Sequence, residues 1–180
     1  MIGIDINLIL KKHDLWIRNP SSGKRADLYG ADLRRANLSE ADLRKADLSE
    51  ADLRKADLRM ADLRRAYLRM ADLSGADLYG ADLRMADLRR ANLSEADLRM
   101  ADLRMADLRK ADLRMTDLSE ADLRRAVITN NVQYMKLLLE SIGINFDFNN
   151  TNNTNKDIGD KATKLLRMID RDKKGGDIDD

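Results

Sequence analysis

The sequence has no cysteine, and this absence excludes disulfide bonds, thiolate metal sites and cysteine nucleophiles. It has one histidine and only 4% aromatic residues. No apolar run approaches the roughly 18 residues of a membrane-spanning helix, and the first residues lack the basic region that begins an export signal. A length of 180 residues suits a single domain. We therefore expect a soluble, cytoplasmic protein with no membrane partner.

An excess of charge of either sign is also missing. The chain has 33 Lys and Arg against 32 Asp and Glu, for a net charge of +1, although charged residues make up 36% of it. A domain that binds nucleic acid through its charge is strongly basic, and a protein mimic of nucleic acid is strongly acidic. The balance argues against both classes.

What the sequence does contain is a tandem repeat. From Ala26 to Arg125 it consists of 20 consecutive five-residue units of the form Ala-(Asp/Asn)-Leu-x-x, with no insertion or deletion. Leu is the third residue of every unit. Thr116 is the only first residue other than Ala, and Tyr67 is the only second residue other than Asp or Asn.

A five-residue period fits neither regular structure. On an α-helix, at about 100° per residue, the leucines would advance by about 140° per unit and spiral around the cylinder. In a flat strand, an odd period would place successive leucines on opposite faces. The pattern is satisfied if the chain turns a corner in every unit, with the first and third residues inward, the second outward and the last two in the turn. The coils would then stack through backbone hydrogen bonds around a solid core of Leu and Ala.

The tandem A(D/N)LXX pattern resembles the pentapeptide-repeat family. The resemblance implies an all-β fold, a right-handed quadrilateral β-helix with four units per coil and therefore about five coils. Some members of that family protect DNA gyrase from quinolones by resembling the DNA duplex in shape and charge, which requires a strongly acidic rod. Here Arg or Lys occupies 20 of the 40 turn positions of the repeat, which counts against that role.

The residues before the repeat predict a cover for its first coil, because a stack of coils ends in an apolar disc and unpaired backbone groups. In residues 1–25 a capping helix is expected to begin near Asp5 or Asn7 and to run to about Arg18, followed by a linker. We expect Trp16 of this helix to pack on the first coil. We expect His13, on the same helix, to be a surface or capping residue.

The residues after the repeat, which we take to span residues 26–128, predict a second cover. Residues 129–170 predict a helix, a short strand and another helix, and residues 171–180 predict a disordered tail. This region carries more apolar surface than one end of the stack needs, so the simplest interpretation is a homodimer; the alternative is that it folds back on its own repeat. The candidate dimer contacts are its apolar residues Leu138, Ile142, Ile144, Phe146, Phe148, Leu165, Leu166 and Ile169.

If successive units are assigned in turn to four sides, the units of one side all have Arg as their fourth residue and Asp as their second residue. Its functional interpretation is contact with phosphates or nucleic acid, and the alternative is a solvated face on which each Arg has an Asp neighbour. Tyr67 replaces an outward Asp and predicts a small exposed patch. Two other tyrosines, Tyr29 and Tyr79, precede glycines that are expected to relax the turn. The candidate partner contacts are therefore Tyr67 and the side's arginines Arg44, Arg64, Arg84, Arg104 and Arg124.

No catalytic constellation, glycine-rich phosphate loop or convergent cluster of metal-binding oxygens is visible in the sequence. We therefore predict a non-enzymatic protein with no cofactor and no metal, which acts as a structural or protein-interaction scaffold for a partner that the sequence does not identify. The alternative is a nucleic-acid-related role, either as a DNA mimic that binds gyrase or by phosphate contact through the arginine ladder.

Overall fold

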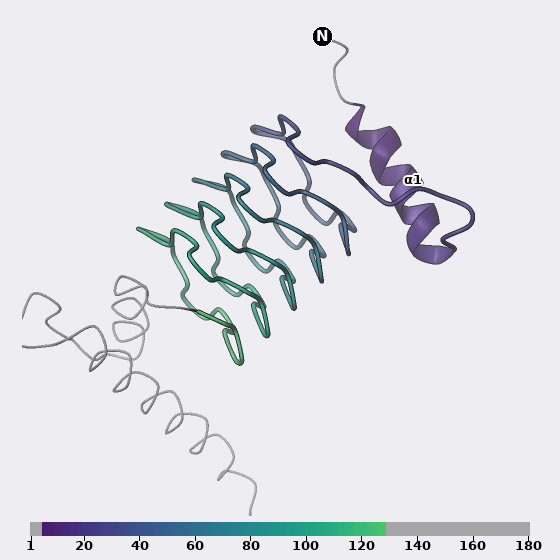
Figure 1. Ribbon diagram of the computed structural model, residues 1–180. Helices are drawn as coiled ribbons and strands as arrows, with labels where there is room; N and C mark the ends of the chain where they lie inside the picture. Colours follow the sequence, from purple (N-terminus) through teal and green to yellow (C-terminus); the bar gives the residue numbers. More distant parts are fainter. Residues whose placement is uncertain (1–4, 129–180) are drawn as a thin grey trace, which may run out of the picture. The chain divides into compact units, whose positions relative to one another are not determined.

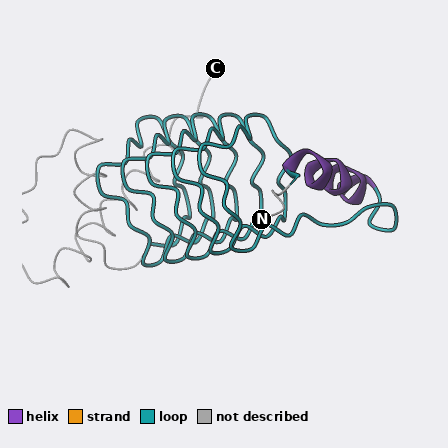
Figure 2. Cartoon of the chain, turned by 90° about the horizontal axis from the view of Figure 1, so that it is seen from above, coloured by secondary structure: helices purple, strands orange, loops and turns teal. Residues whose placement is uncertain are grey.

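The computed structural model describes residues 5–128, which form one helix, α1 (Ile6–Arg18), followed by the coiled repeat (Figure 1). Within this range the repeat pairs through isolated parallel β-bridges rather than through longer strands. The bridges join second-position residues that lie 20 positions apart, such as Asp62 with Asp82 and Asp82 with Asp102. Since 20 residues are four units, each coil has four sides, and successive coils lie in register (Figure 2).

The all-β architecture predicted from the sequence is thus present as one-residue-wide columns of bridges. The backbone hydrogen bonds of one side show why the columns hold. The N–H of Leu63 donates to the carbonyl of Asp82 at 2.8 Å, the N–H of Asp82 to that of Ala61 at 2.9 Å, and the N–H of Arg65 to that of Arg84 at 3.0 Å. Side and corner residues are therefore both bonded to the next coil, so the register between coils is fixed at each unit.

Ala and Leu fill the interior, as the five-residue period predicts. Between Leu43 and Ala106 every repeat Ala and Leu is at most 1% exposed, whereas Leu118 and Leu123, near the end of the described range, are half-buried. Thr116 is buried in a position otherwise taken by Ala, and its Oγ1 donates to the carbonyl of Leu93 at 2.7 Å. This bond satisfies a hydroxyl that would otherwise destabilise an apolar core.

Each corner is a hydrogen-bonded turn with a left-handed residue. The N–H of Ala66, for example, donates to the carbonyl of Leu63 at 3.0 Å. The fifth residue of every unit has φ between 57° and 65°, and 17 of these residues are Arg, Lys, Glu or Met. A positive φ at the third residue of such a turn is typical of type II and usually requires Gly or Asn. The glycines after Tyr29 and Tyr79 lie at such corners, with φ of 61° and 65°, where the absence of a Cβ relaxes the turn as predicted, but glycine is not required because the other corners adopt the same geometry with a Cβ.

α1 lies against the first coil through named contacts. Its N-cap is Asp5, whose side chain accepts the N–H of Leu8 at 3.0 Å, and it ends at Arg18. The ring of Trp16 lies 6.0 Å from the Nζ of Lys45, a residue of the first coil. A Cβ at Gly23 would lie 2.3 Å from backbone atoms of α1, so only glycine allows the linker to pass this close to the helix.

His13 is predicted from the sequence to be a surface or capping residue, and of the two alternatives its position agrees with capping. It is fully buried, and its Nδ1 accepts the N–H of Ala26, the first residue of the repeat, at 3.0 Å. Its ring also stacks on Trp16 with 5.6 Å between the centroids. Burial lowers the pKa of His13, and the carboxylate of Asp42 offsets only part of this effect, while the charge of Arg44 adds to it. The imidazole thus joins α1 to the repeat in its neutral form.

The predicted helix, strand and helix of residues 129–170, the predicted tail of residues 171–180 and all eight candidate dimer contacts lie outside the described residues.

The corner geometry predicts that side-chain branching matters at the fifth position. Replacing Glu95, whose φ is 60°, with Val should destabilise the protein by about 1–2 kcal/mol relative to Glu95→Gly, because a branched Cβ crowds a left-handed backbone. Both variants remove the same carboxylate, so each is the control for the other. Urea denaturation measures the difference, and equal midpoints would contradict the assigned corner.

His13 predicts a pH dependence of the first coil. Because its folded pKa lies below the reference value of 6.5, the stabilisation by neutral His13 is complete above pH 6.5 and is lost as the pH falls through the folded pKa. The fluorescence of Trp16, the single tryptophan, should therefore report a transition below pH 6.5. His13→Asn retains a hydrogen-bond acceptor without this titration and should remove the transition; a transition of the same size in that variant would exclude His13 as its origin.

Candidate interaction faces of the repeat

The register of 20 residues sorts the outward side chains into faces, which we name by one member. The Arg84 face comprises the units 41–45, 61–65, 81–85, 101–105 and 121–125. The Tyr79 face comprises 36–40, 56–60, 76–80, 96–100 and 116–120, and the Tyr67 face comprises 26–30, 46–50, 66–70, 86–90 and 106–110. The five arginines predicted as partner contacts all lie on the Arg84 face, whereas Tyr67 lies in a separate column, bridged to Asp47 and Asp87.

The second residue of a unit shapes the turn that follows it. On the Arg84 face, Oδ1 of Asp82 accepts the backbone N–H of Arg84 at 3.2 Å. Asn does the same elsewhere, since Oδ1 of Asn92 accepts the N–H of Ser94 at 3.1 Å. A side-chain oxygen that bonds the backbone two residues later is an Asx turn. The preference for Asp or Asn in the repeat therefore has a local structural cause that is independent of charge.

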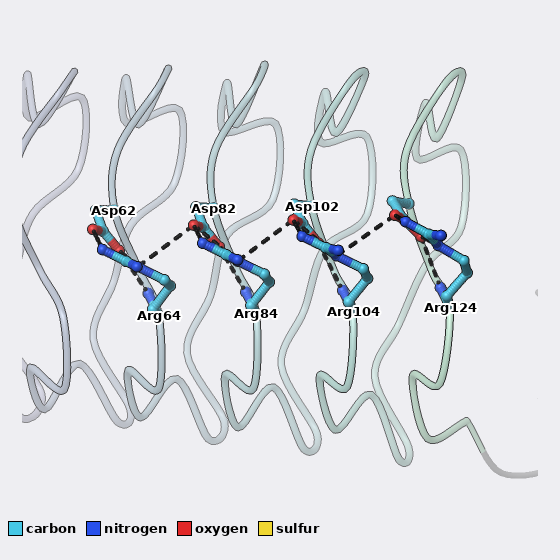
Figure 3. A network of polar contacts seen from close by, with 8 residues as sticks. Asp62, Arg64, Asp82, Arg84, Asp102, Arg104 and Arg124 are labelled. Atoms are coloured by element: carbon cyan, nitrogen blue, oxygen red, sulfur yellow. Dashed lines mark hydrogen bonds and ion pairs between the residues drawn. The ribbon is translucent and has the colours of Figure 1, made fainter.

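The arginines of the Arg84 face are held by carboxylates of two coils (Figure 3). Arg84 donates from Nε to Oδ1 of Asp82 at 2.8 Å and from Nη2 to Oδ2 at 2.5 Å, and its Nε lies 3.4 Å from Oδ2 of Asp102 in the next coil. The same pattern recurs along the face, with coil-to-coil distances of 3.5 Å for Arg44 and Arg64 and 3.6 Å for Arg104. The result is a continuous ladder of alternating charge.

The ladder perturbs the pKa of its members. Partial burial raises the pKa of Asp102, but hydrogen bonds from Arg104 outweigh it and hold the pKa below its usual value. The hydrogen bond from Arg124 likewise lowers the pKa of Asp122, and the pKa of Arg84 is raised by its bonds to Asp82. Asp102 and Asp122 therefore contribute stability that is present above about pH 4 and is lost as the pH falls through their lowered pKa values.

This arrangement argues against the Arg84 face as a phosphate site. A phosphate would have to displace a carboxylate that makes two short bonds to the same guanidinium and is fixed by the turn. The face does carry an excess of basic residues at its corners, namely Lys45, Arg65 and Arg125. Those side chains are exposed and stand apart from the ladder.

Tyr67 is exposed and lies under a cation. The guanidinium carbon of Arg25 is 5.6 Å from the centre of its ring, and Nη2 of Arg25 is 3.9 Å from Oδ2 of Asp47. Because Tyr67 takes the place of an Asp, Arg69 has no carboxylate in its own unit. The position of Tyr67 agrees with the outward patch predicted from the sequence, but the approach of Arg25 was not foreseen.

The Tyr79 face holds a cluster that sequence reasoning missed. The Oη of Tyr79 donates to Sδ of Met100 at 3.0 Å, and the guanidinium carbon of Arg99 lies 5.6 Å from the ring of Tyr79. Sδ of Met60 lies 2.6 Å from the point where a Cβ on Gly80 would be. Met60, Gly80 and Met100 are spaced by 20 residues, so the register of the repeat was the signal that could have revealed them together.

Two further classes of site are absent from residues 5–128. No helix there is long and apolar enough to span a membrane. No group of three or more His, Cys, Asp or Glu side chains in that range converges as a metal site would require.

Comparison with known proteins gives a consistent family. Among solved structures, the pentapeptide repeat protein Rfr23 from the cyanobacterium Cyanothece 51142 is 32% identical with a TM-score of 0.58, and the match covers 59% of this chain and 86% of that chain. The pentapeptide repeat protein alr5209 from Nostoc Pcc 7120 is 38% identical with a TM-score of 0.54, and the match covers 68% of this chain and 98% of that chain. The family described as pentapeptide repeats matches in eight copies, over residues 24–59, 46–84, 56–94 and 86–125.

Other comparisons add less. QnrB1, a plasmid-mediated fluoroquinolone resistance protein, is 20% identical with a TM-score of 0.29, over 67% of this chain and 84% of that chain, and so carries no argument about function. No curated protein matches the chain.

The two roles of the second residue predict different effects for two substitutions. Asp82→Ala removes both the turn acceptor and the ion pairs and should destabilise the protein by about 1–2 kcal/mol. Asp82→Asn keeps the acceptor, as Asn92 does, and should cost less than about 1 kcal/mol because the ion pairs are partly exposed. Thermal denaturation compares the two, and equal losses for Asn and Ala would show that charge, not the turn, dominates.

Proposed function

Because this chain belongs to the pentapeptide repeat family, we propose that it is a non-enzymatic scaffold that binds protein through the outer faces of its coils. Proteins of this family are generally structural or interaction proteins, and their fold is a right-handed quadrilateral β-helix. The observation that carries the proposal is the filled interior. Ala and Leu side chains occupy the whole space inside the coils, so contacts with other molecules fall to the outward second, fourth and fifth residues.

The outer faces suit binding because their side chains are fixed before a partner arrives. Each fourth-position Arg of the Arg84 face is held by hydrogen bonds, and each corner is bonded to the next coil. Side chains that are already ordered lose less conformational entropy on binding. The scaffold proposal thus follows from rigidity as well as from the filled core.

The alternative proposal is a nucleic-acid-related role, either as a DNA mimic that binds gyrase or through phosphates on the arginine ladder. The balanced charge of the repeat and the carboxylates paired with Arg44, Arg64, Arg84 and Arg104 weigh against it. A homodimer through residues 129–170 and a cytoplasmic location likewise stay proposals, supported by the sequence pattern alone.

Capture from a native lysate tests the scaffold. The full chain should retain specific proteins that are not retained by Leu63→Asp/Leu83→Asp, a variant that has the same surface residues but places two charges in the core and should not fold. Equal capture by the two chains would refute the proposal. On the same preparation, a mobility shift of duplex DNA at low salt, or inhibition of gyrase supercoiling by the folded chain, would support the alternative instead.

A further inference from the structure

The Tyr79 face differs from the other faces in the sign of its uncompensated charge. It carries six carboxylates against two guanidinium groups, those of Arg59 and Arg99. The Arg84 face, by contrast, carries five carboxylates against eight basic side chains. The acidic excess of the Tyr79 face arises because Ser or Tyr replaces Arg at three of its fourth positions, Ser39, Tyr79 and Ser119.

The carboxylates of this face are divided between its centre and its ends. At the ends, Glu40 and Glu120 are exposed corner residues, and neither makes an ion pair with any residue between 5 and 128. At the centre, Asp77 has no arginine in its own unit; its Oδ1 accepts the N–H of Tyr79 at 3.1 Å, and its one ion pair within residues 5–128 is with Nε of Arg59, at 3.6 Å. A ligand that lies along this corner therefore meets negative charge at both ends of its path.

Between the two glutamates lies the exposed apolar cluster of Met60, Tyr79 and Met100. Their exposed fractions are 59%, 38% and 53%, although all three are large apolar side chains. They are joined through the Tyr79 hydroxyl on Met100 and through the thioether of Met60, which lies over Gly80. Since Gly80 has no side chain, the column of fifth-position residues leaves a space between the two methionines. The side chain of Met60 extends into that space.

We propose that the Tyr79 face binds a positively charged protein segment that inserts apolar side chains between Met60 and Met100; this rests on the scaffold function proposed above. Methionine side chains adapt to apolar partners of different shape, and the hydroxyl of Tyr79 holds the thioether of Met100 in place. Carboxylates at both ends favour Lys or Arg in the ligand and repel a nucleic acid backbone. The partner is therefore a cationic, amphipathic segment of another protein.

The register fixes the spacing that such a segment needs. At about 4.8 Å per coil, Met60 and Met100 are separated by about 10 Å and Glu40 and Glu120 by about 19 Å. On an α-helix, which rises 1.5 Å per residue, these distances correspond to about 7 and about 13 residues. A helix with apolar residues at i, i+3 and i+7 and with Lys or Arg toward both ends fits the face.

Methyl NMR on the full chain tests this proposal. The chain has nine methionines, and their ¹³C-labelled methyl signals are assigned by single Met→Leu substitutions. The probe is a designed helical peptide of about 15 residues with leucines at i, i+3 and i+7 and lysines toward its ends, and its comparison peptide has Glu in place of every Lys. Only the lysine peptide should shift the Met60 and Met100 signals, and it should leave Met70 and Met115 unchanged.

Matched variants locate the site. Met60→Ser/Met100→Ser should weaken peptide binding at least tenfold, whereas Met70→Ser/Met115→Ser, which changes two exposed corner methionines on other faces, should change it less than twofold. Glu40→Gln/Glu120→Gln should weaken binding and reduce its dependence on salt. Equal losses from the two methionine pairs, or shifts spread over all methionines, would overturn the proposal.

Two other results would overturn the proposed face, and a third, which can be told apart from them, would overturn the scaffold function on which it rests. Shifts of Met60 and Met100 with protein concentration alone would show that a second copy of this chain occupies the face. If Met60→Ser/Met100→Ser retains from a lysate every protein that the unaltered chain retains, the assigned face is wrong while the scaffold function stands. If neither chain retains more than the unfolded Leu63→Asp/Leu83→Asp control, the scaffold function itself fails.

Discussion

The left-handed residue at each corner is the constraint on which the rest of the structure depends. A turn at every fifth residue is what points Ala and Leu to the same side of the chain in every unit, and the bridges at 20-residue spacing follow from four such turns. The strain at each corner is local, about 1–2 kcal/mol for a residue with a Cβ. It is offset by the core, because burial of one leucine contributes about as much or more. The sequence therefore tolerates Arg, Lys, Glu and Met where an isolated turn would need glycine.

The outward residues fall into two groups, one that the fold requires and one that is available for binding. The second residue belongs to the fold, since its oxygen bonds the N–H two residues later whether it is Asp82 or Asn92. The fourth residue is optional, because Ser, Tyr and Arg all follow the same turn. An Arg at that position adds an ion-pair ladder, but the ladder is partly exposed and contributes modestly. The fourth and fifth positions are thus free to carry contacts without altering the coil.

The sequence was sufficient to predict the structure at positions where the residue type has a single physical explanation. The period of five required inward leucines, and the repeat leucines between Leu43 and Leu103 are fully buried. The sequence was not sufficient where the cause lay in the register or in burial. The sequence left His13 as either a surface or a capping residue, because nothing in α1 shows that a backbone N–H, that of Ala26, approaches it from the repeat. The positive φ of the corners was missed because long polar side chains at those positions carry no turn signal.

Two of the exposed tyrosines, Tyr67 and Tyr79, show how one substitution changes the charge of a single unit. Tyr67 replaces an Asp, so Arg69 is left without a carboxylate in its own unit, and a further cation, Arg25, approaches the ring. Tyr79 replaces an Arg, so Asp77 is left without a guanidinium in its own unit and pairs with Arg59 of the preceding coil, while the Tyr79 ring contacts Met100 and Arg99. One substitution thus removes a negative charge from the repeating unit, and the other removes a positive charge. Because the turn tolerates such departures, the Tyr79 face has a surplus of carboxylates and the Arg84 face a surplus of basic side chains, and the balanced charge of the whole chain conceals both.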